Sequence, residues 1–95
     1  MADTEDPTVK VSDAKDRSRY EIEVEGELAG LADYRLNEEV ITFTHTEIDP
    51  AFGGRGLGGK LIEFAVNDAR SRNLTIVPRC SFVHTWVTEH PEEEG

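Results

Sequence analysis

The chain has 95 residues, of which 37% are hydrophobic and 32% are charged, and this size and composition predict one small domain with a thin core. Ten Lys and Arg stand against twenty Asp and Glu, and the formal net charge of −10 argues against general nucleic-acid binding, which needs a basic surface. The longest apolar runs are far shorter than the roughly 20 residues of a membrane span. The acidic N-terminus does not resemble a secretory signal. A single cysteine excludes a disulfide framework. We therefore expect a cytoplasmic protein that binds neither a membrane nor nucleic acid.

The first and last segments are predicted to be tails. Residues 1–16 are polar and acidic, and only Val9 and Val11 alternate with polar residues, so we expect a flexible acidic tail with room for one short strand. The glutamates of residues 92–95 predict a second acidic tail. The domain itself is expected over residues 17–91.

Three strands are predicted next, one after another. Residues 19–25 alternate strictly between apolar and polar side chains, which is typical of a half-buried strand. Residues 28–36 and 40–48 predict two more strands, and the second of these is rich in β-branched residues. Short turns at Gly26 and at residues 37–39 connect the three strands, which indicates an antiparallel meander.

The pattern changes at the glycine-rich loop of residues 52–59. From Leu57 onward the apolar residues recur at helical spacing, which predicts a helix that ends near Arg72. Residues 74–77 predict a short buried strand, and a strand–helix–strand crossover of this length implies parallel pairing with the strand at 40–48. A second, shorter helix is expected over residues 80–90, with one apolar face made of Phe82, Val83, Trp86 and Val87. The predicted fold class is therefore α+β.

The glycine-rich loop fits two nucleotide-binding patterns in part. It has the glycine spacing of a dinucleotide fingerprint, and Gly54 to Lys60 has the spacing of a P-loop as far as the lysine. A P-loop needs Ser or Thr after that lysine to hold Mg²⁺, and Leu61 stands there. A dinucleotide site needs a carboxylate at the end of the following strand, which here leads into Arg79. Both patterns are disfavoured for these reasons.

A glycine-rich loop at the start of a helix can still bind an anion. Glycines let the backbone approach a ligand closely, and the first amides of a helix carry a partial positive charge. Residues 56–60 would present such amides between the cationic side chains of Arg55 and Lys60, which suits a pyrophosphate. The alternative is a turn that only leads the strand into the helix. The candidate binding residues of the loop are Gly54, Arg55, Gly56, Leu57, Gly58, Gly59 and Lys60.

Three short motifs accompany this loop. They are His-Thr-Glu-Ile at residues 45–48, Pro-Arg-Cys-Ser-Phe-Val at residues 78–83 and His-Pro-Glu at residues 90–92. In this order, with Gly-Arg-Gly-Leu-Gly-Gly at residues 54–59, they resemble the GNAT superfamily of acyl-CoA-dependent N-acetyltransferases, and most closely its small single-domain members. The resemblance covers residues 20–92.

The resemblance implies a GNAT-like fold in which the strands at 40–48 and 74–77 splay apart and acyl-CoA lies between them. The pyrophosphate would lie on the amides of residues 55–60, and the pantetheine arm would pair with the backbone of Glu47 and Ile48. The implied reaction is the transfer of an acetyl group from acetyl-CoA to an amine, carried by a small molecule or by a protein.

Acetyl transfer needs a base for the ammonium acceptor. His45 and Glu47 are two residues apart on one strand and so share a face, and either could be the base. The alternatives are a structural histidine and an exposed carboxylate. Cys80 is the third candidate, as a nucleophile that accepts the acetyl group, and its alternative is a small buried side chain. A metal site of Cys80, His84 and His90 lacks a fourth ligand, and we expect no metal.

A second function remains open at this stage. The helices that build an acceptor pocket between the first strands of longer superfamily members are missing here. The chain could therefore be a CoA-binding or protein-interaction module with weak or no turnover. In either case we expect a monomer or a weak homodimer.

Overall fold

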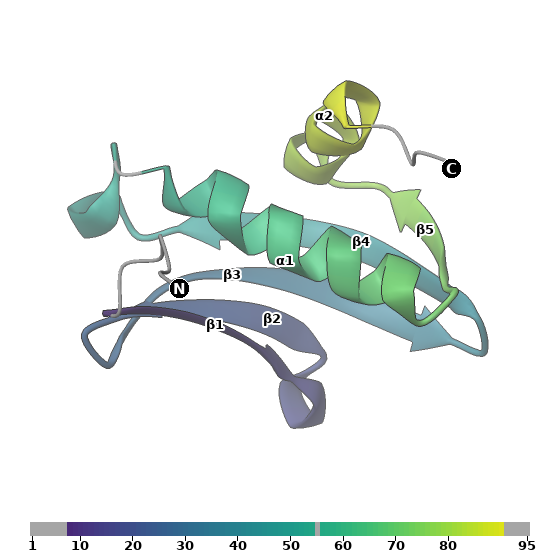
Figure 1. Ribbon diagram of the computed structural model, residues 1–95, viewed down its shortest axis with the longest axis horizontal. Helices are drawn as coiled ribbons and strands as arrows, with labels where there is room; N and C mark the ends of the chain where they lie inside the picture. Colours follow the sequence, from purple (N-terminus) through teal and green to yellow (C-terminus); the bar gives the residue numbers. More distant parts are fainter. Residues whose placement is uncertain (1–7, 55, 91–95) are drawn as a thin grey trace.

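The computed structural model describes residues 8–54 and 56–90, which form one five-stranded sheet and two α-helices (Figure 1). The strands lie across the sheet in the order of the sequence, the first four antiparallel and the last two parallel. They are β1 (Val9–Ala14), β2 (Arg19–Val24), β3 (Glu27–Asn37), β4 (Val40–Ile48) and β5 (Thr75–Pro78). The predicted α+β class, the meander and the parallel crossover are confirmed.

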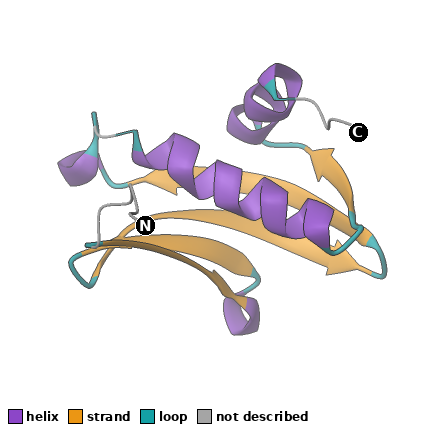
Figure 2. Ribbon diagram, viewed as in Figure 1, coloured by secondary structure: helices purple, strands orange, loops and turns teal. Residues whose placement is uncertain are grey.

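The helix α1 (Leu57–Ser71) lies along one face of the sheet (Figure 2). Its apolar residues recur every three or four positions, so they form one stripe that packs on the sheet. The helix follows Gly56, which has a left-handed φ of 72°, and a left-handed Asn73, with a φ of 60°, follows its end. The hydrophobic core lies between α1 and the sheet. Its fully buried side chains include Leu61, Ile62 and Val66 of α1 and Tyr20, Ile22, Ile41 and Phe43 of the sheet.

The strand β1 belongs to the sheet along its whole length, from Val9 opposite Val24 to Ala14 opposite Arg19. We placed the boundary of the folded domain at residue 17, and this boundary is wrong because the sheet begins at Val9. The physical reason is that Val9 and Val11 pack against the core and extend its apolar face. The rest of the two predicted tails, residues 1–7 and 92–95, lies outside the described residues.

A polar cluster joins β1 to α1 beneath this edge of the sheet. The hydroxyl of Tyr20 donates to Asp68 Oδ2 at 2.6 Å, and that of Tyr34 donates to Asp13 Oδ1 at 2.7 Å. Arg72 Nη2 bridges the two carboxylates, at 2.9 Å from Asp13 and 3.0 Å from Asp68. Burial and then the hydrogen bond to Asp13 raise the pKa of Tyr34 to about 12, and burial together with Asp68 raises the pKa of Tyr20 further. These contacts explain why residues before the predicted boundary are held in the domain.

The strand β4 contains a β-bulge. Tyr34 lies opposite Phe43 and Asp33 lies opposite His45, so Thr44 is an extra residue in β4. An extra residue reverses the alternation of side chains along a strand. The residues of β4 after the bulge therefore do not continue the in-and-out pattern that precedes it.

The pairing between β4 and β5 ends at the same level, where Phe43 lies opposite Pro78. The amides of Arg79 and Cys80 both donate to the carbonyl of Phe43, at 3.0 and 3.1 Å, and the chain then leaves the sheet for the second helix. In the described part of the chain, residues 44–48 consequently have a strand neighbour on the β3 side only. We call this the open edge of β4. It agrees with the predicted splaying of the two strands.

The helix α2 (Ser81–Glu89) lies beside α1, on the same side of the sheet (Figure 2). We predicted four of its residues on one buried face, but only Val83 is fully buried. Trp86 and Val87 are half-buried, and Phe82 is 42% exposed. The reason is that Val83, Trp86 and Val87 face the core, whereas the ring of Phe82 lies over Gly58 at the start of α1. Neither helix among the described residues is long and apolar enough to cross a membrane.

Candidate functional site

The open edge of β4 exposes backbone hydrogen-bonding groups in an alternating pattern. The carbonyl of Phe43 points toward β5, where it accepts from Arg79, whereas the amide of Asp49 points toward β3 and donates to Ala29. Because successive residues of a strand point to alternate sides, counting back from Asp49 directs Glu47 toward β3. The same count directs the amide and carbonyl groups of Thr46 and Ile48 toward the open edge.

The first turn of α1 presents the second set of free polar groups. Gly54 and Gly56 both have left-handed φ angles, of 80° and 72°, which only glycine adopts at low cost. The amide of Lys60 donates to the carbonyl of Gly56 at 3.3 Å and so closes the first turn. The amides before it are those that helix geometry leaves unpaired, and they belong to residues 56–59. Lys60 therefore contributes its exposed side chain rather than its amide, and Arg55 lies outside the described residues.

The glycines of this turn have different tasks. A Cβ on Gly58 would lie 2.5 Å from the ring of Phe82, so Gly58 is required for the packing of α2 on α1. A Cβ on Gly59 would meet nothing within 4 Å. The space beside Gly59 is therefore open to a ligand, and its lack of a side chain is not explained by packing.

His45 and Glu47 lie on the face of the sheet that points away from α1. They are opposite Asp33 and Leu31 in the register, whereas Thr46 between them is opposite the buried Ala32. His45 Nε2 is 3.2 Å from Glu47 Oε1, and both side chains are more than half exposed. The shared face that we predicted for this pair is observed.

The same face carries a second carboxylate two strands away, at Glu21 of β2. Glu21 accepts hydrogen bonds of 2.8 Å from Arg17 and from Arg19, and it is buried beneath them. The hydrogen bond from Arg19, followed by that from Arg17, lowers the pKa of Glu21. Glu21 is thus neutralised by its partners, while the carboxylate of Glu47 faces only a histidine.

Cys80 lies on the other face, at the start of α2. Its Sγ is 3.1 Å from the hydroxyl of Thr46, across the open edge of β4. Its thiol is half-buried, and the position immediately precedes the first helical residue, where a helix favours negative charge. Sequence reasoning did not single out Thr46 by itself, because the bulge that directs its side chain toward Cys80 leaves no clear signal in the residue pattern.

The structure thus places the three catalytic candidates around one edge, but not on one face. Cys80 approaches the open edge from the α1 side, and His45 with Glu47 approaches from the opposite side. Within the ranges 8–54 and 56–90, no group of three His, Cys, Asp or Glu side chains is arranged to hold a metal ion.

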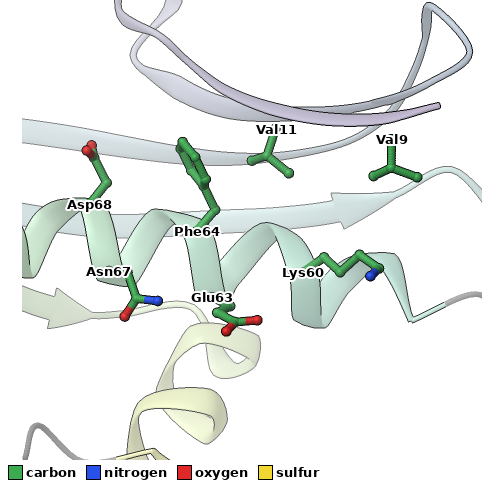
Figure 3. A pocket seen from close by; sticks show the side chains of 7 residues that line it. All are labelled: Val9, Val11, Lys60, Glu63, Phe64, Asn67 and Asp68. Carbon is green, nitrogen blue, oxygen red and sulfur yellow. The ribbon is translucent and has the colours of Figure 1, made fainter. Parts of the chain in front are cut away.

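A groove on the described surface lies elsewhere. It has a volume of about 590 Å³, lies between β1 and the outer side of α1, and has Phe64 near its centre (Figure 3). Its lining residues are Val9, Val11, Lys60, Glu63, Phe64, Asn67 and Asp68. Among the candidate residues that the structure describes, only Lys60 contributes to this groove.

A five-stranded sheet with a bulge, an open edge and a glycine-rich helix start defines an acyltransferase fold, and the comparisons agree. Residues 19–95 match the sequence profile described as GCN5-related N-acetyl-transferase. The chain belongs to this family, and it is an acyltransferase of the N-acetyltransferase type. Among proteins with curated descriptions, none matches the chain significantly.

Two solved structures are similar to this chain. A GCN5-like protein from Staphylococcus aureus, studied by NMR, has 28% sequence identity and a TM-score of 0.64, over 86% of this chain and 81% of its own. The crystal structure of a ribosomal-protein-alanine N-acetyltransferase from Brucella melitensis biovar Abortus 2308 has 17% identity and a TM-score of 0.62. That similarity covers 85% of this chain and 67% of the other, and at this identity it supports the fold alone.

Proposed function

We propose that the chain transfers an acetyl group from acetyl-CoA to a primary amine. The observation that carries the proposal is that two sets of free backbone groups meet at one end of the fold. The open edge of β4 ends at Ile48, and eight residues separate it from Leu57, where α1 begins and its first turn presents its amides. An extended arm and a pyrophosphate need such an edge and such a turn.

The residues present fit the chemistry of CoA. The amides of residues 56–59 can donate to the pyrophosphate, the bare backbone of Gly59 allows a close approach, and the exposed ammonium of Lys60 adds a positive charge. The pantetheine arm contains two amide groups, which can pair with the backbone of Thr46 and Ile48 along the open edge. We expected the arm to use Glu47 and Ile48, and the alternation of β4 moves the first of these partners to Thr46.

His45 and Glu47 are proposed to take the proton from the amine. An ammonium acceptor must lose a proton before its nitrogen can attack the thioester carbonyl. The C–N bond then forms, the C–S bond breaks, CoA leaves as a thiolate that takes up a proton, and the nitrogen loses its second proton. A carboxylate can accept this first proton. Within the described residues the ionic partner of Glu47 is His45, so we assign the step to Glu47, alone or with His45. The net charge of −10 favours a cationic acceptor over an anionic one.

Cys80 offers a second route to the same product. Its sulfur could accept the acetyl group from CoA and pass it to the amine, with the two C–S exchanges leaving the overall balance unchanged. Brief exposure to acetyl-CoA followed by mass spectrometry of the intact chain would then show one acetyl group on Cys80. A Cys80→Ala variant that keeps the native rate would establish direct transfer instead.

Calorimetry with acetyl-CoA and with CoA tests the proposal. We expect binding of both, and loss of most of the affinity for CoA when its pyrophosphate portion is removed from the ligand. Absence of heat at millimolar acetyl-CoA would reject the proposal. Binding without acetylated product from a panel of amines and peptides would instead favour a CoA-binding module. The observation behind this alternative is that, among the described residues, no α-helix covers the far face of the sheet to form an acceptor pocket.

A further inference from the structure

The contact between Thr46 and Cys80 joins two elements that are distant in sequence. The two residues are 34 positions apart, and the 3.1 Å between Thr46 Oγ1 and Cys80 Sγ spans the open edge of β4. The backbone of Cys80 is fixed independently, because its amide donates to Phe43 at 3.1 Å and its carbonyl accepts from His84 at 2.9 Å. Rotation of the side chain is the freedom that remains, and the Thr46 hydroxyl restricts it.

A hydroxyl suits both states of a thiol. It can accept a hydrogen bond from the neutral S–H group, and it can donate one to the thiolate. The second bond is the stronger of the two, because one partner carries a full charge.

Thr46 also occupies a particular place on the edge. Its backbone groups point to the gap that we assign to pantetheine, and its side chain points to Cys80 on the α1 side. One residue can thus determine the distance between the bound thioester arm and the sulfur. The neighbouring residues His45 and Glu47 point to the other face and cannot do this.

We propose that Thr46 is a positioning residue for Cys80, whose hydroxyl holds the sulfur at the open edge of β4. The effect on Cys80 is a property of the free protein. Its consequence for acetyl transfer rests on the function proposed above.

Alkylation of Cys80 with iodoacetamide tests this without any cofactor, because Cys80 is the only cysteine of the chain. The native protein, Thr46→Val and Thr46→Ser are compared near neutral pH, with the alkylated chain measured by mass spectrometry. Loss of the hydrogen bond to the sulfur should slow the reaction of Thr46→Val about three- to tenfold. Thr46→Ser keeps the hydroxyl and should remain within about twofold of the native rate.

Two results would overturn the proposal. One is a Thr46→Val protein that reacts at the native rate, and the other is a Thr46→Ser protein that is as slow as Thr46→Val. Thermal unfolding shows whether each variant is folded, and Thr46→Ala replaces Thr46→Val if the latter is not. Calorimetry with acetyl-CoA on the native chain tests the proposed function separately, so a failure of one proposal is not mistaken for a failure of the other.

Discussion

The two halves of β4 are neighbours in sequence but have opposite roles. Residues 40–43 lie between β3 and β5, and Ile41 and Phe43 are completely buried beneath α1. Residues 44–48 have a strand on one side only among the described residues, and none of their side chains is fully buried. The bulge at Thr44 separates the two halves, so one extra residue divides a buried segment from a more exposed one.

The difference shows how a small domain can combine a core with a site. The first half contributes apolar burial, which is the main source of stability in a chain of this size. The second half leaves backbone groups of Thr46 and Ile48 without a partner in the sheet, which costs stability and provides binding capacity. Substitutions in the two halves should therefore affect different properties.

The largest effect is expected for Phe43→Ala in the buried half. Removing a completely buried aromatic side chain leaves a cavity and should lower the free energy of unfolding by about 3–5 kcal/mol. Denaturant unfolding measures this. His45→Ala, two residues away on the exposed half, is the control and should change stability by less than about 0.5 kcal/mol. Equal losses for the two variants would show that the halves are not distinct.

A loss of stability is expected next at alkaline pH, from two tyrosines of β2 and β3 that share the core with the buried half of β4. The chain has two tyrosines, and the pKa of each is raised in the folded state, that of Tyr34 to about 12. The folded state therefore holds protons that the unfolded state releases near pH 10, so the stability that they provide is complete below about pH 10 and is lost above it. Ultraviolet absorbance should show no tyrosine ionising at its ordinary midpoint before the chain unfolds. A normal titration of either tyrosine in the folded protein would contradict the buried cluster.

Gly30→Ala should disturb the exposed half with a smaller cost. The added Cβ would lie 2.9 Å from the carbonyl oxygen of Glu47 and would collide with the side chain of Ile48, so the end of β4 must move. Overpacking of this kind costs about 1–3 kcal/mol, and we also expect weaker binding of acetyl-CoA in calorimetry. Gly53→Ala is the matched control, because its Cβ would lie at an ordinary 3.4 Å from the carbonyl oxygen of Pro50. Equal affinities of the two variants would show that the end of β4 does not bind the cofactor.

The smallest change in stability is expected for Gly59→Ala, and its direction is opposite. Alanine fits the open space beside the helix and should stabilise α1 by up to about 1 kcal/mol. If the first turn binds a pyrophosphate, the added methyl group should nevertheless weaken acetyl-CoA binding. Asn67→Ala, in the exposed middle of α1, should raise stability without changing the affinity. Unchanged affinity in Gly59→Ala would remove Gly59 from the site.

Much of the fold could be predicted because the buried side chains repeat regularly. The bounds of β4 at Val40 and Ile48 were predicted, and α1 differs from its prediction by one residue. The inclusion of β1 in the sheet was underestimated, because two valines are a weak signal and the ion pairs of Asp13 form only in the folded chain. The exposure of Phe82 depends on how the start of α2 packs against Gly58 of α1, which no local pattern shows.

The site could be predicted as a set of residues but not as an arrangement. Periodicity correctly placed His45 and Glu47 on one face. It could not show that Cys80 lies on the opposite face with Thr46, because this depends on the bulge and on the end of β5 at Pro78. The family motifs indicate which residues matter, and tertiary geometry determines which of them meet.

The chain passes from β1 to β2 through a 3-10 helix, η1 (Lys15–Arg17), of only three residues. So short a connection cannot fold over the sheet as a lid above His45 and Glu47. Enzymes with lids often wait for them to open before product leaves. If the acceptor binds at this face as proposed, the connection between β1 and β2 imposes no such step, and a lysine on the surface of a folded protein should reach the face as readily as a small free amine.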